Sequence, residues 1–533
     1  MPKIGAKSIL MKIKVLLSVF LFVILVILLA ILLNTYVVSE AQNTGSNELK
    51  QEQKISSDFD KYAEEARKSW NIPGMAVAIV KDDKIIFSKG YGVKKLGDND
   101  PIDAHTLFQI GSTSKAFTTT LMAMLVDEKK LNWKDKVIDH YPEFRMYDPW
   151  VTREFMVEEL TEQHSGLPAY SIDALAFFGF DRNYIMNVLR FVKPISSFRT
   201  EFAYVNHLFL VAAKILEIKT GKTWEENLKE RIFVPLNMNE SSSDMKSLLK
   251  SKNAAFGHCL QNNQIAPAPV DFNWMYIYAP TGGINSNITD MAEWLKLHIN
   301  NGQVNGKKIV SSENLNFTHS PKTIIDSENK LKAYYCNGWV YVEPKPFSAV
   351  IHDGQTSGYQ SFVAFWPEQK TGIVILTNSI HHNLPKALFF YLNDLFFNSG
   401  SQHDWSKEFL DAFNKKQKDD IAKRLIKPDK PVSLLPLDKY IETYCNEFYG
   451  AVKIEKVDNM LQLTIGPDKY KFSMIHWNGN IFELKDSKEI ANGNSQNFAR
   501  FELDENQKVV KLTLDFLNKD GCGIFVPENK DNK

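Results

Sequence analysis

An uncharged apolar run from Val15 to Leu33 constrains the chain most, because a segment of this kind is stable within a lipid bilayer. At 1.5 Å per residue the run spans about 28 Å as a helix, close to the thickness of the bilayer hydrocarbon. Four lysines precede it, and no further charge follows before Glu40 (Lys3, Lys7, Lys12 and Lys14). Because the positive flank of a membrane segment stays in the cytoplasm, we expect everything after residue 40 to be extracytoplasmic.

The same run is compatible with two fates. Its length favours a retained transmembrane anchor, since the apolar core of a secretory signal has only about 7–15 residues. A cleaved signal peptide is the alternative, because Ser39-Glu40-Ala41 offers small residues to a signal peptidase. We therefore expect either a membrane-anchored protein or a secreted or periplasmic one.

Charge and cysteine content exclude several classes of protein. Lys+Arg and Asp+Glu both number 63, so no basic excess favours nucleic-acid binding. The four cysteines include no C-x-x-C pair and are too few for a disulfide scaffold, so we expect no metal and no other cofactor. In an oxidising compartment a Cys445–Cys522 disulfide and four free thiols are both open.

The chain divides into four predicted regions. Residues 1–54 hold the anchor or signal segment and a polar tether. Residues 55–400 begin and end with strand-like hairpins and carry apolar helical stretches between them, which is typical of an α+β domain. A helical linker is predicted at 401–436. In 437–533, short strand-like runs alternate with turn signals, which predicts a small antiparallel β-barrel or sandwich.

Ser112-Thr113-Ser114-Lys115 is the first candidate for catalysis. S-x-x-K also begins at Ser243, Ser247 and Ser327, but only Ser112 follows an extended apolar entry and opens an apolar helix. Backbone N–H groups at such a helix start can stabilise an oxyanion, and Lys115 lies one turn along. Lys115 can accept the serine proton if burial lowers its pKa from about 10.4 towards neutrality. The alternative is a helix N-cap at Ser112 and a surface lysine at Lys115.

Tyr204-Val205-Asn206 is the second candidate. It leads from a short extended piece into a helix that starts at His207, so it lies on a loop where side chains converge. We expect cations beside the phenol of Tyr204 to ease the loss of its proton, so that it serves as base or acid. Asn206 is expected to bind a substrate amide. A core tyrosine with a satisfied hydroxyl is the alternative.

His352-Asp353-Gly354 is the third candidate. K-T-G occurs at 219–221 and 370–372, but the first is predicted to end a helix and the second to form a hairpin turn. His352 instead ends an apolar run and precedes small and polar residues, where it can donate to a substrate carboxylate or carbonyl. Gly354 is expected to let the substrate backbone approach closely. A solvated loop histidine is the alternative.

In this order and at these spacings, the three elements resemble those of the serine β-lactamase and penicillin-binding protein superfamily. The likeness is closest to the class C β-lactamase-related branch, which includes esterases, D-amino-acid peptidases and LACTB-like proteins. Two further segments are similar to that branch, Gln163-His164-Ser165-Gly166-Leu167-Pro168 to H-x-S-G-L-P and Gly282-Gly283-Ile284-Asn285-Ser286 to G-G-x-x-S. The resemblance covers about 70–380. It implies an antiparallel sheet flanked by helices plus an all-helical lobe, with the active site between them.

The resemblance also implies a role for each residue. Ser112 would be the acylated nucleophile, Lys115 its base partner, and Tyr204 the relay of the proton to the leaving group. Asn206 would hold the substrate and His352 would take the place of the K-T-G lysine. The oxyanion hole would be the backbone N–H of Ser112 and of Gln355. The C-terminal region resembles a lipocalin-like β-domain.

These observations predict an extracytoplasmic serine hydrolase that acts through an acyl-enzyme on an ester, amide or peptide, as a D-aminopeptidase, carboxypeptidase or esterase does. The sequence departs from true β-lactamases at His352 and Asp353, where Lys and Thr are usual, and a nearby acid discourages an anionic ligand. A class C β-lactamase and a non-catalytic penicillin-binding-like sensor or scaffold are the alternatives. The expected partners are a small-molecule or peptide substrate and, through the N-terminal helix, the membrane, but not nucleic acid.

Overall fold

The computed structural model of the chain has two compact units, Met1–Tyr62 and Ala63–Lys533, each of which is described by itself. The structure describes residues 5–261, 264–268, 273–326, 332–344, 346–380, 382–398, 403–486, 496–518 and 521–528.

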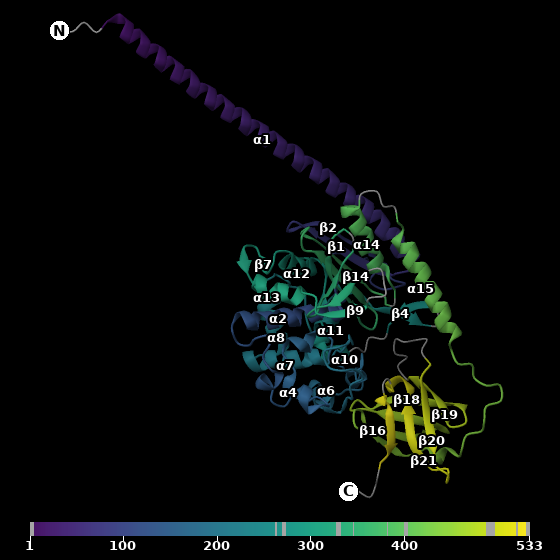
Figure 1. The fold of residues 1–533 in the computed structure, drawn as a ribbon. Helices are drawn as coiled ribbons and strands as arrows, with labels where there is room; N and C mark the ends of the chain where they lie inside the picture. The colour runs from purple at the N-terminus through teal and green to yellow at the C-terminus, as the bar shows by residue number, and fades with distance from the viewer. Residues whose placement is uncertain are drawn as a thin grey trace. The chain divides into compact units, whose positions relative to one another are not determined.

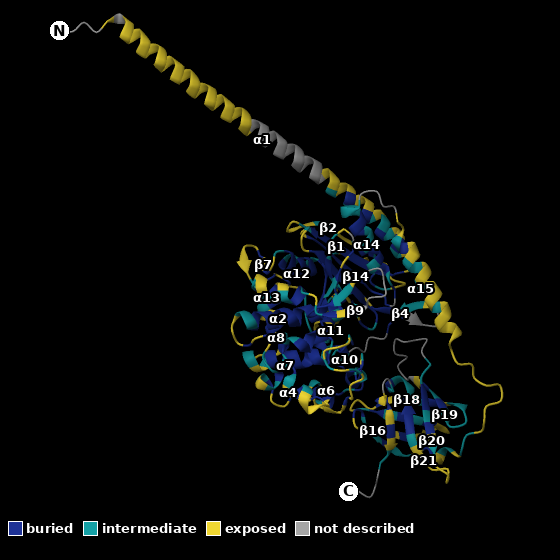
Figure 2. Cartoon of the chain, in the orientation of Figure 1, coloured by how far each residue is buried: buried dark blue, intermediate teal, exposed yellow. Residues whose placement is uncertain are grey.

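The first unit is helical. Helix α1 (Ala6–Ser69) begins in it and contains the segment Lys7–Asn34, which is exposed, long enough and apolar enough to cross a membrane (Figures 1 and 2). This composition fits a signal segment as well as an anchor. The polar stretch 42–54, predicted to be a tether, is helical instead. It contains no proline, and its second half is rich in Gln, Glu and Lys, all of which favour a helix.

An antiparallel eight-stranded sheet organises the first part of the second unit, in the order β2-β1-β14-β13-β12-β11-β10-β9 (Figure 1). The hairpin predicted around Asp82-Asp83 forms, and its first strand pairs with β14 at the other end of the domain, for example Val77 opposite Ile375. The strands are β1 (Gly74–Lys81), β2 (Lys84–Gly92), β9 (Thr323–Asp326), β10 (Ala333–Tyr335), β11 (Val340–Val342), β12 (Ala349–Gln355), β13 (Gln360–Trp366) and β14 (Thr371–Thr377). Three two-stranded pairs accompany them: β3 (Phe108–Gln109) with β6 (Asn285–Ser286), β4 (His258–Gln261) with β5 (Gln264–Pro267), and β7 (Gln303–Val304) with β8 (Lys307–Lys308).

Helices cover both faces of this sheet. Phe365 of β13 lies against His298 of α12 (Ile288–Ile299), with ring centroids 5.7 Å apart. Its neighbour Trp366 stacks on Phe389 of α14 (Leu384–Phe397), with centroids 5.0 Å apart. Because consecutive side chains of a strand point to opposite faces, α12 and α14 lie on opposite sides. Burial on both faces explains why β13 and β14 are buried along their whole length.

A helical lobe stands beside the sheet. Its centre is α2 (Lys115–Asp127) packed against α7 (Leu208–Thr220), close to the two helical stretches predicted there. Gly221 ends α7 in the left-handed conformation, at φ 70°, as expected for the first K-T-G. The remaining helices are α3 (Val137–His140), α4 (Pro149–Glu154), α5 (Ala174–Phe177), α6 (Arg182–Val188), α8 (Trp224–Leu228), α9 (Met245–Lys250), α10 (Asn273–Ile277), α11 (Ala279–Gly282), α13 (Ser312–His319) and α15 (Trp405–Ala422).

The C-terminal part of the unit is a closed barrel of eight antiparallel strands. Its strands are β15 (Thr443–Asn446), β16 (Gly450–Val457), β17 (Met460–Ile465), β18 (Tyr470–Asn478), β19 (Ile481–Asp486), β20 (Phe498–Leu503), β21 (Val509–Leu514) and β22 (Ile524–Pro527). Pairing of β15 with β22, which sets Cys445 opposite Val526, closes the ring. The predicted fold class is confirmed, and of the two predicted forms of the β-domain the barrel is the one observed. None of the four cysteines is joined in a disulfide, so the Cys445–Cys522 bond is not formed.

Candidate active site

Ser112 lies on a tight turn between a strand and a helix. The 3₁₀ turn Gly111–Ser114 follows β3 and passes directly into α2. The residue at the N-cap of α2 is Ser114, so the alternative that Ser112 is that N-cap is wrong. The Ser112 side chain is partly exposed, which makes its hydroxyl accessible to a substrate.

Lys115 is completely buried beneath this turn. Its Nζ lies 3.2 Å from Ser112 Oγ, 2.7 Å from Asn206 Oδ1 and 3.1 Å from the carbonyl oxygen of Thr281. Burial lowers the Lys115 pKa to about 7, although the negative charges of Asp173 and Asp353 oppose this shift. The expectation of a buried lysine with a near-neutral pKa is confirmed, and the alternative of a surface lysine is wrong.

Tyr204 lies over the same lysine, whose Nζ is 4.8 Å from the centre of the tyrosine ring. The expectation that its proton is easily lost is wrong, because burial raises the Tyr204 pKa well above its ordinary value and the neighbouring Tyr335 raises it further. Tyr204 is therefore a neutral phenol at physiological pH, able to pass a proton on but not to act as a resting base.

Asn206 is bonded to protein groups at both ends of its side-chain amide. Its Oδ1 accepts the hydrogen bond from Lys115, and its Nδ2 donates to Asp173 Oδ2 at 2.6 Å. Both contacts are internal, so the amide bridges Lys115 and Asp173 in this structure.

Gln163 holds the loop that carries Tyr204 and Asn206. Its Oε1 accepts from Val205 N at 2.6 Å and its Nε2 donates to Val205 O at 3.2 Å, so the buried amide pairs with the backbone as a neighbouring strand would. Gln163 is the first residue of the segment that is similar to H-x-S-G-L-P, and nothing in its spacing along the sequence indicates this role.

His352 contacts the site from β12. Its Nδ1 lies 2.6 Å from the carbonyl oxygen of Asp353 and its Nε2 3.4 Å from the hydroxyl of Tyr335. A carbonyl can only accept, so Nδ1 carries the proton and Nε2 is an acceptor. Burial lowers the His352 pKa to about 4, which keeps the ring neutral. It has no spare N–H in this arrangement, so the geometry does not support donation to a substrate, and its burial excludes a solvated loop histidine.

Gly354 serves a different contact from the one expected. A Cβ at this position would lie 2.0 Å from Ile110 O and 2.9 Å from Ser112 N. The glycine therefore lets β12 approach the turn that carries Ser112, rather than leaving room for a substrate backbone. On the other side, a Cβ on Gly111 would lie 2.6 Å from Gln355 N, so the two backbone nitrogens expected to form the oxyanion hole belong to segments in direct contact.

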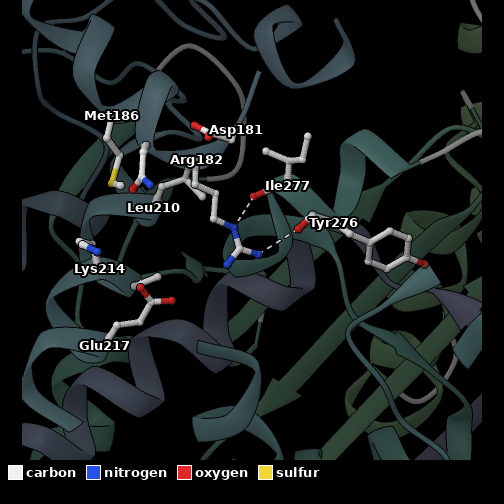
Figure 3. Close-up of a pocket in the computed structure, with 10 residues that line it drawn as sticks. Asp181, Arg182, Met186, Leu210, Lys214, Glu217, Tyr276 and Ile277 are labelled. Carbon is white, nitrogen blue, oxygen red and sulfur yellow. Dashed lines mark hydrogen bonds between the residues drawn. The ribbon is translucent and has the colours of Figure 1, made fainter. Parts of the chain in front are cut away.

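A separate cavity of about 480 Å³ lies beside α6 and α7 (Figure 3). Arg182 extends across it and donates to the carbonyl oxygens of Ile277 and Tyr276, as the dashed lines show. Its described lining consists of Asp181, Arg182, Asn183, Met186, Leu210, Ala213, Lys214, Glu217, Tyr276 and Ile277, and includes none of the residues around Ser112. Across the described part of the chain, no group of three or more His, Cys, Asp or Glu residues is arranged to hold a metal ion.

A sheet flanked by helices, a helical lobe, and a serine with a buried lysine one turn along a helix define the serine β-lactamase and penicillin-binding protein superfamily. The chain belongs to the Beta-lactamase family, whose model matches residues 59–389. A second model, for a domain of unknown function (DUF3471), matches residues 427–521. The predicted resemblance is thereby confirmed, and at the level of the family the protein is a serine hydrolase.

Known relatives match most of the chain. An unguisins hydrolase, ungD, of Aspergillus violaceofuscus is 25% identical over 452 residues, covering 77% of this chain and 78% of that protein. Protein flp of Staphylococcus aureus is 27% identical over 340 residues, and the match covers 62% of this chain and 64% of protein flp. The octameric penicillin-binding protein homologue from Pyrococcus abyssi aligns with a TM-score of 0.58 at 20% identity, over 86% of this chain and 97% of that one, which shows a shared fold.

Proposed function

We propose that the protein is an extracytoplasmic serine hydrolase that cleaves an ester, amide or peptide through an acyl-enzyme at Ser112. The observation that carries this proposal is the buried Lys115 amine, with a pKa of about 7, at 3.2 Å from Ser112 Oγ. A neutral amine at this distance can take the serine proton as the hydroxyl attacks.

The reaction proceeds in two halves. Lys115 Nζ accepts the proton of Ser112, and Ser112 Oγ forms a bond to the substrate carbonyl carbon, while the backbone N–H groups of Ser112 and Gln355 stabilise the oxyanion. The intermediate collapses with loss of the leaving group, which takes the proton through the neutral hydroxyl of Tyr204. Water then attacks the acyl carbon and gives a proton to Lys115 Nζ. The bond from that carbon to Ser112 Oγ breaks, the acid product leaves, and Ser112 Oγ takes the proton back from Lys115.

The charges beside the nucleophile favour a peptidase or esterase over a β-lactamase. Asp173 and Asp353 both act electrostatically on Lys115, and His352 is neutral. The two carboxylates would therefore repel an anionic antibiotic, and the neutral His352 would supply no positive charge to attract it. The naming of a relative as an unguisins hydrolase supports hydrolysis as the class of reaction.

The test is covalent labelling of the full chain in detergent with a fluorophosphonate probe, followed by mapping of the adduct. We expect the label on Ser112, lost in Ser112→Ala and retained in Ser243→Ala, which alters the serine of another S-x-x-K. No label, or a label that survives Ser112→Ala, would contradict the proposal. A panel of D-amino-acid peptides, short esters and a chromogenic cephalosporin then identifies the bond cleaved, and labelling without turnover of any of them would favour a sensor.

A further inference from the structure

A line of hydrogen bonds runs from Asp173 through Asn206 to Lys115. Asp173 Oδ2 accepts from Asn206 Nδ2 at 2.6 Å, and Asn206 Oδ1 accepts from Lys115 Nζ at 2.7 Å. Asp173 belongs to none of the three catalytic motifs, and nothing in its spacing distinguishes it from other aspartates. Its carboxylate nevertheless accepts from the nitrogen of the Asn206 amide, the end opposite to the oxygen that faces the lysine.

The three oxygens around Lys115 Nζ suit a protonated lysine, which donates to all three, and they also suit the neutral amine that a base requires. Such an amine has two N–H donors and one lone pair. Asn206 Oδ1 and Thr281 O can only accept, so they use both N–H groups. The lone pair is then left for the third neighbour, the hydroxyl of Ser112 at 3.2 Å. This is the arrangement that a base requires.

Of the two acceptors, only the side chain can be reversed. The carbonyl of Thr281 is part of the backbone of α11, whereas a side-chain amide can turn over and exchange its oxygen and nitrogen. In the reversed state Asn206 Nδ2 would donate to Lys115 and occupy its lone pair. An ionised Asp173 excludes that state, because a carboxylate only accepts and would then face the amide oxygen.

The backbone around Asp173 is built for this contact. Asp173 stands at the N-cap of α5, yet its side chain makes no cap hydrogen bond. Tyr170 and Ile172, neither of them glycine, have φ of 57° and 52°, a left-handed conformation that costs roughly 1–3 kcal/mol per residue. Tyr170 N also donates to Tyr204 O at 2.8 Å, which ties this loop to the one that carries Asn206.

We propose that Asp173 is a positioning residue, which fixes the orientation of the Asn206 amide so that Lys115 keeps its lone pair for Ser112. This proposal rests on the proposed function at Ser112. The proposal adds to that function a role for Asp173, a residue outside the three motifs, in the activation of Ser112.

The decisive variant is Asp173→Asn. A carboxamide at position 173 has both a donor and an acceptor, so it can form a hydrogen bond with Asn206 in either orientation of the Asn206 amide. The readout is the rate of fluorophosphonate labelling of Ser112 in the full chain, measured from pH 5 to 10 and divided by the folded fraction. We expect the plateau rate at high pH to fall by about tenfold or more, the scale of loss that misplacing a catalytic group causes. A purely electrostatic role would leave the plateau unchanged and move only the midpoint.

Asp353→Asn is the matched control for charge. The titratable groups that act on Lys115 are Asp173 before α5, Asp353 and His352 on β12, and Tyr204 on its loop. Both carboxylates raise the Lys115 pKa, so removing either should move the rising limb of the rate to lower pH. Asp353→Asn should do this while keeping the plateau within about threefold, since its side chain makes no hydrogen bond to Asn206 among the described contacts.

The double variant Asp173→Asn with Asn206→Asp tests orientation directly. The carboxylate introduced at position 206 would present only acceptor oxygens to Lys115, and the amide introduced at position 173 would donate to that carboxylate, so the lone pair is free again. We expect recovery to at least about a third of the wild-type plateau, reached at higher pH because the new carboxylate is closer to Lys115.

An unchanged plateau in Asp173→Asn, or a double variant below that threshold, would overturn the assignment. If Asp173→Asn does not fold, the double variant alone tests the assignment, which then requires a plateau rate of at least about a third of the wild-type value. A wild-type chain that takes no label at Ser112 would instead contradict the proposed function, so the two failures are distinguishable.

Discussion

At the scale of single residues, the site depends on keeping a lysine uncharged. Lys115 is fully buried and has a pKa of about 7, and its neighbours Tyr204 and His352 are neutral as well. Desolvation is the main cause in each case, because it disfavours every charged form. The same burial that prepares the base therefore has consequences for pH dependence and for stability.

The rate of acylation should rise with pH. Lys115 accepts a proton only when it is neutral, so the labelling rate at Ser112 should increase through a midpoint near pH 7 and level off above it. Lys115→Ala should lower the plateau by about 10²–10⁴-fold. Lys370→Ala, in the K-T-G of the turn before β14, should leave the profile unchanged. A flat profile in the wild-type chain would mean that another group is the base.

Lys115→Met should abolish activity and stabilise the fold. The unfolded chain keeps its lysine charged up to a pKa of about 10.4, whereas the folded chain loses that proton near 7, so the buried amine destabilises the folded state most below pH 7 and progressively less as the pH rises to 10.4. The penalty reaches about 4 kcal/mol at pH 7 and vanishes above pH 10.4. Denaturant unfolding of both proteins at pH 7 and pH 10 measures this, and an equal gap at the two pH values would refute it.

At the scale of elements, the site is held by contacts between segments that are distant in the chain. Helix α2 and the turn before it carry Lys115 and Ser112, β12 carries His352, and the loop before α7 carries Tyr204 and Asn206. A buried glutamine and a glycine described above fix the loop and the strand in place (Gln163 and Gly354). The two roles can be tested by substitutions that change packing and hydrogen bonding around the site but leave Ser112, Lys115 and Tyr204 in place.

Gln163→Ala should weaken catalysis more than substrate binding. It leaves the buried N–H and C=O of Val205 without their partners, which costs about 1–3 kcal/mol per group, and it frees the loop that carries Tyr204. We expect kcat to fall by about 10–100-fold, with little change in KM for the substrate that the panel identifies. Gln369→Ala, in the turn after β13, is the control. Equal effects on kcat from the two variants would rule out this role.

Gly354→Ala should separate β12 from the turn at Ser112. The added Cβ would meet the backbone at Ile110 and Ser112, and backbone atoms cannot move aside cheaply. We expect the labelling rate to fall by at least about 10²-fold, the scale of losing an oxyanion donor. Gly306→Ala, whose Cβ would meet nothing within 4 Å, should retain labelling. Full labelling of Gly354→Ala would show that β12 can shift to accommodate the added Cβ without disturbing the turn at Ser112.

The sequence was sufficient for the local elements, but not for the orientation of the motif side chains. Alternation and apolar periodicity predicted the hairpin at 75–87 and the helix that follows Ser112, because these signals are local. The roles of Gln163 and Asp173 depend on which end of an amide faces which neighbour across distant loops, and no spacing encodes that. The burial that raises the Tyr204 pKa is likewise a property of the folded core.

At the scale of the whole molecule, the N-terminal segment and the catalytic domain make one prediction together. Helix segment Lys7–Asn34 is compatible with an anchor and with a signal peptide. If our proposal is correct, the catalytic domain is digested by protease added to intact cells. Replacing the four lysines that precede Val15 with glutamate should reduce this exposure, because the orientation depends on them. Protection of the wild-type domain would contradict an extracytoplasmic site, and the N-terminal residue of the mature chain distinguishes anchor from signal.

None of the four cysteines is joined in a disulfide, a bond that is common in proteins outside the cytoplasm. No covalent cross-link restricts the unfolded chain, so the fold depends on packing, hydrogen bonds and the closure of the barrel by β15 and β22. The native state should therefore be indifferent to the redox potential of its surroundings. Reducing agents can accompany every assay described above, and folding requires no oxidative maturation.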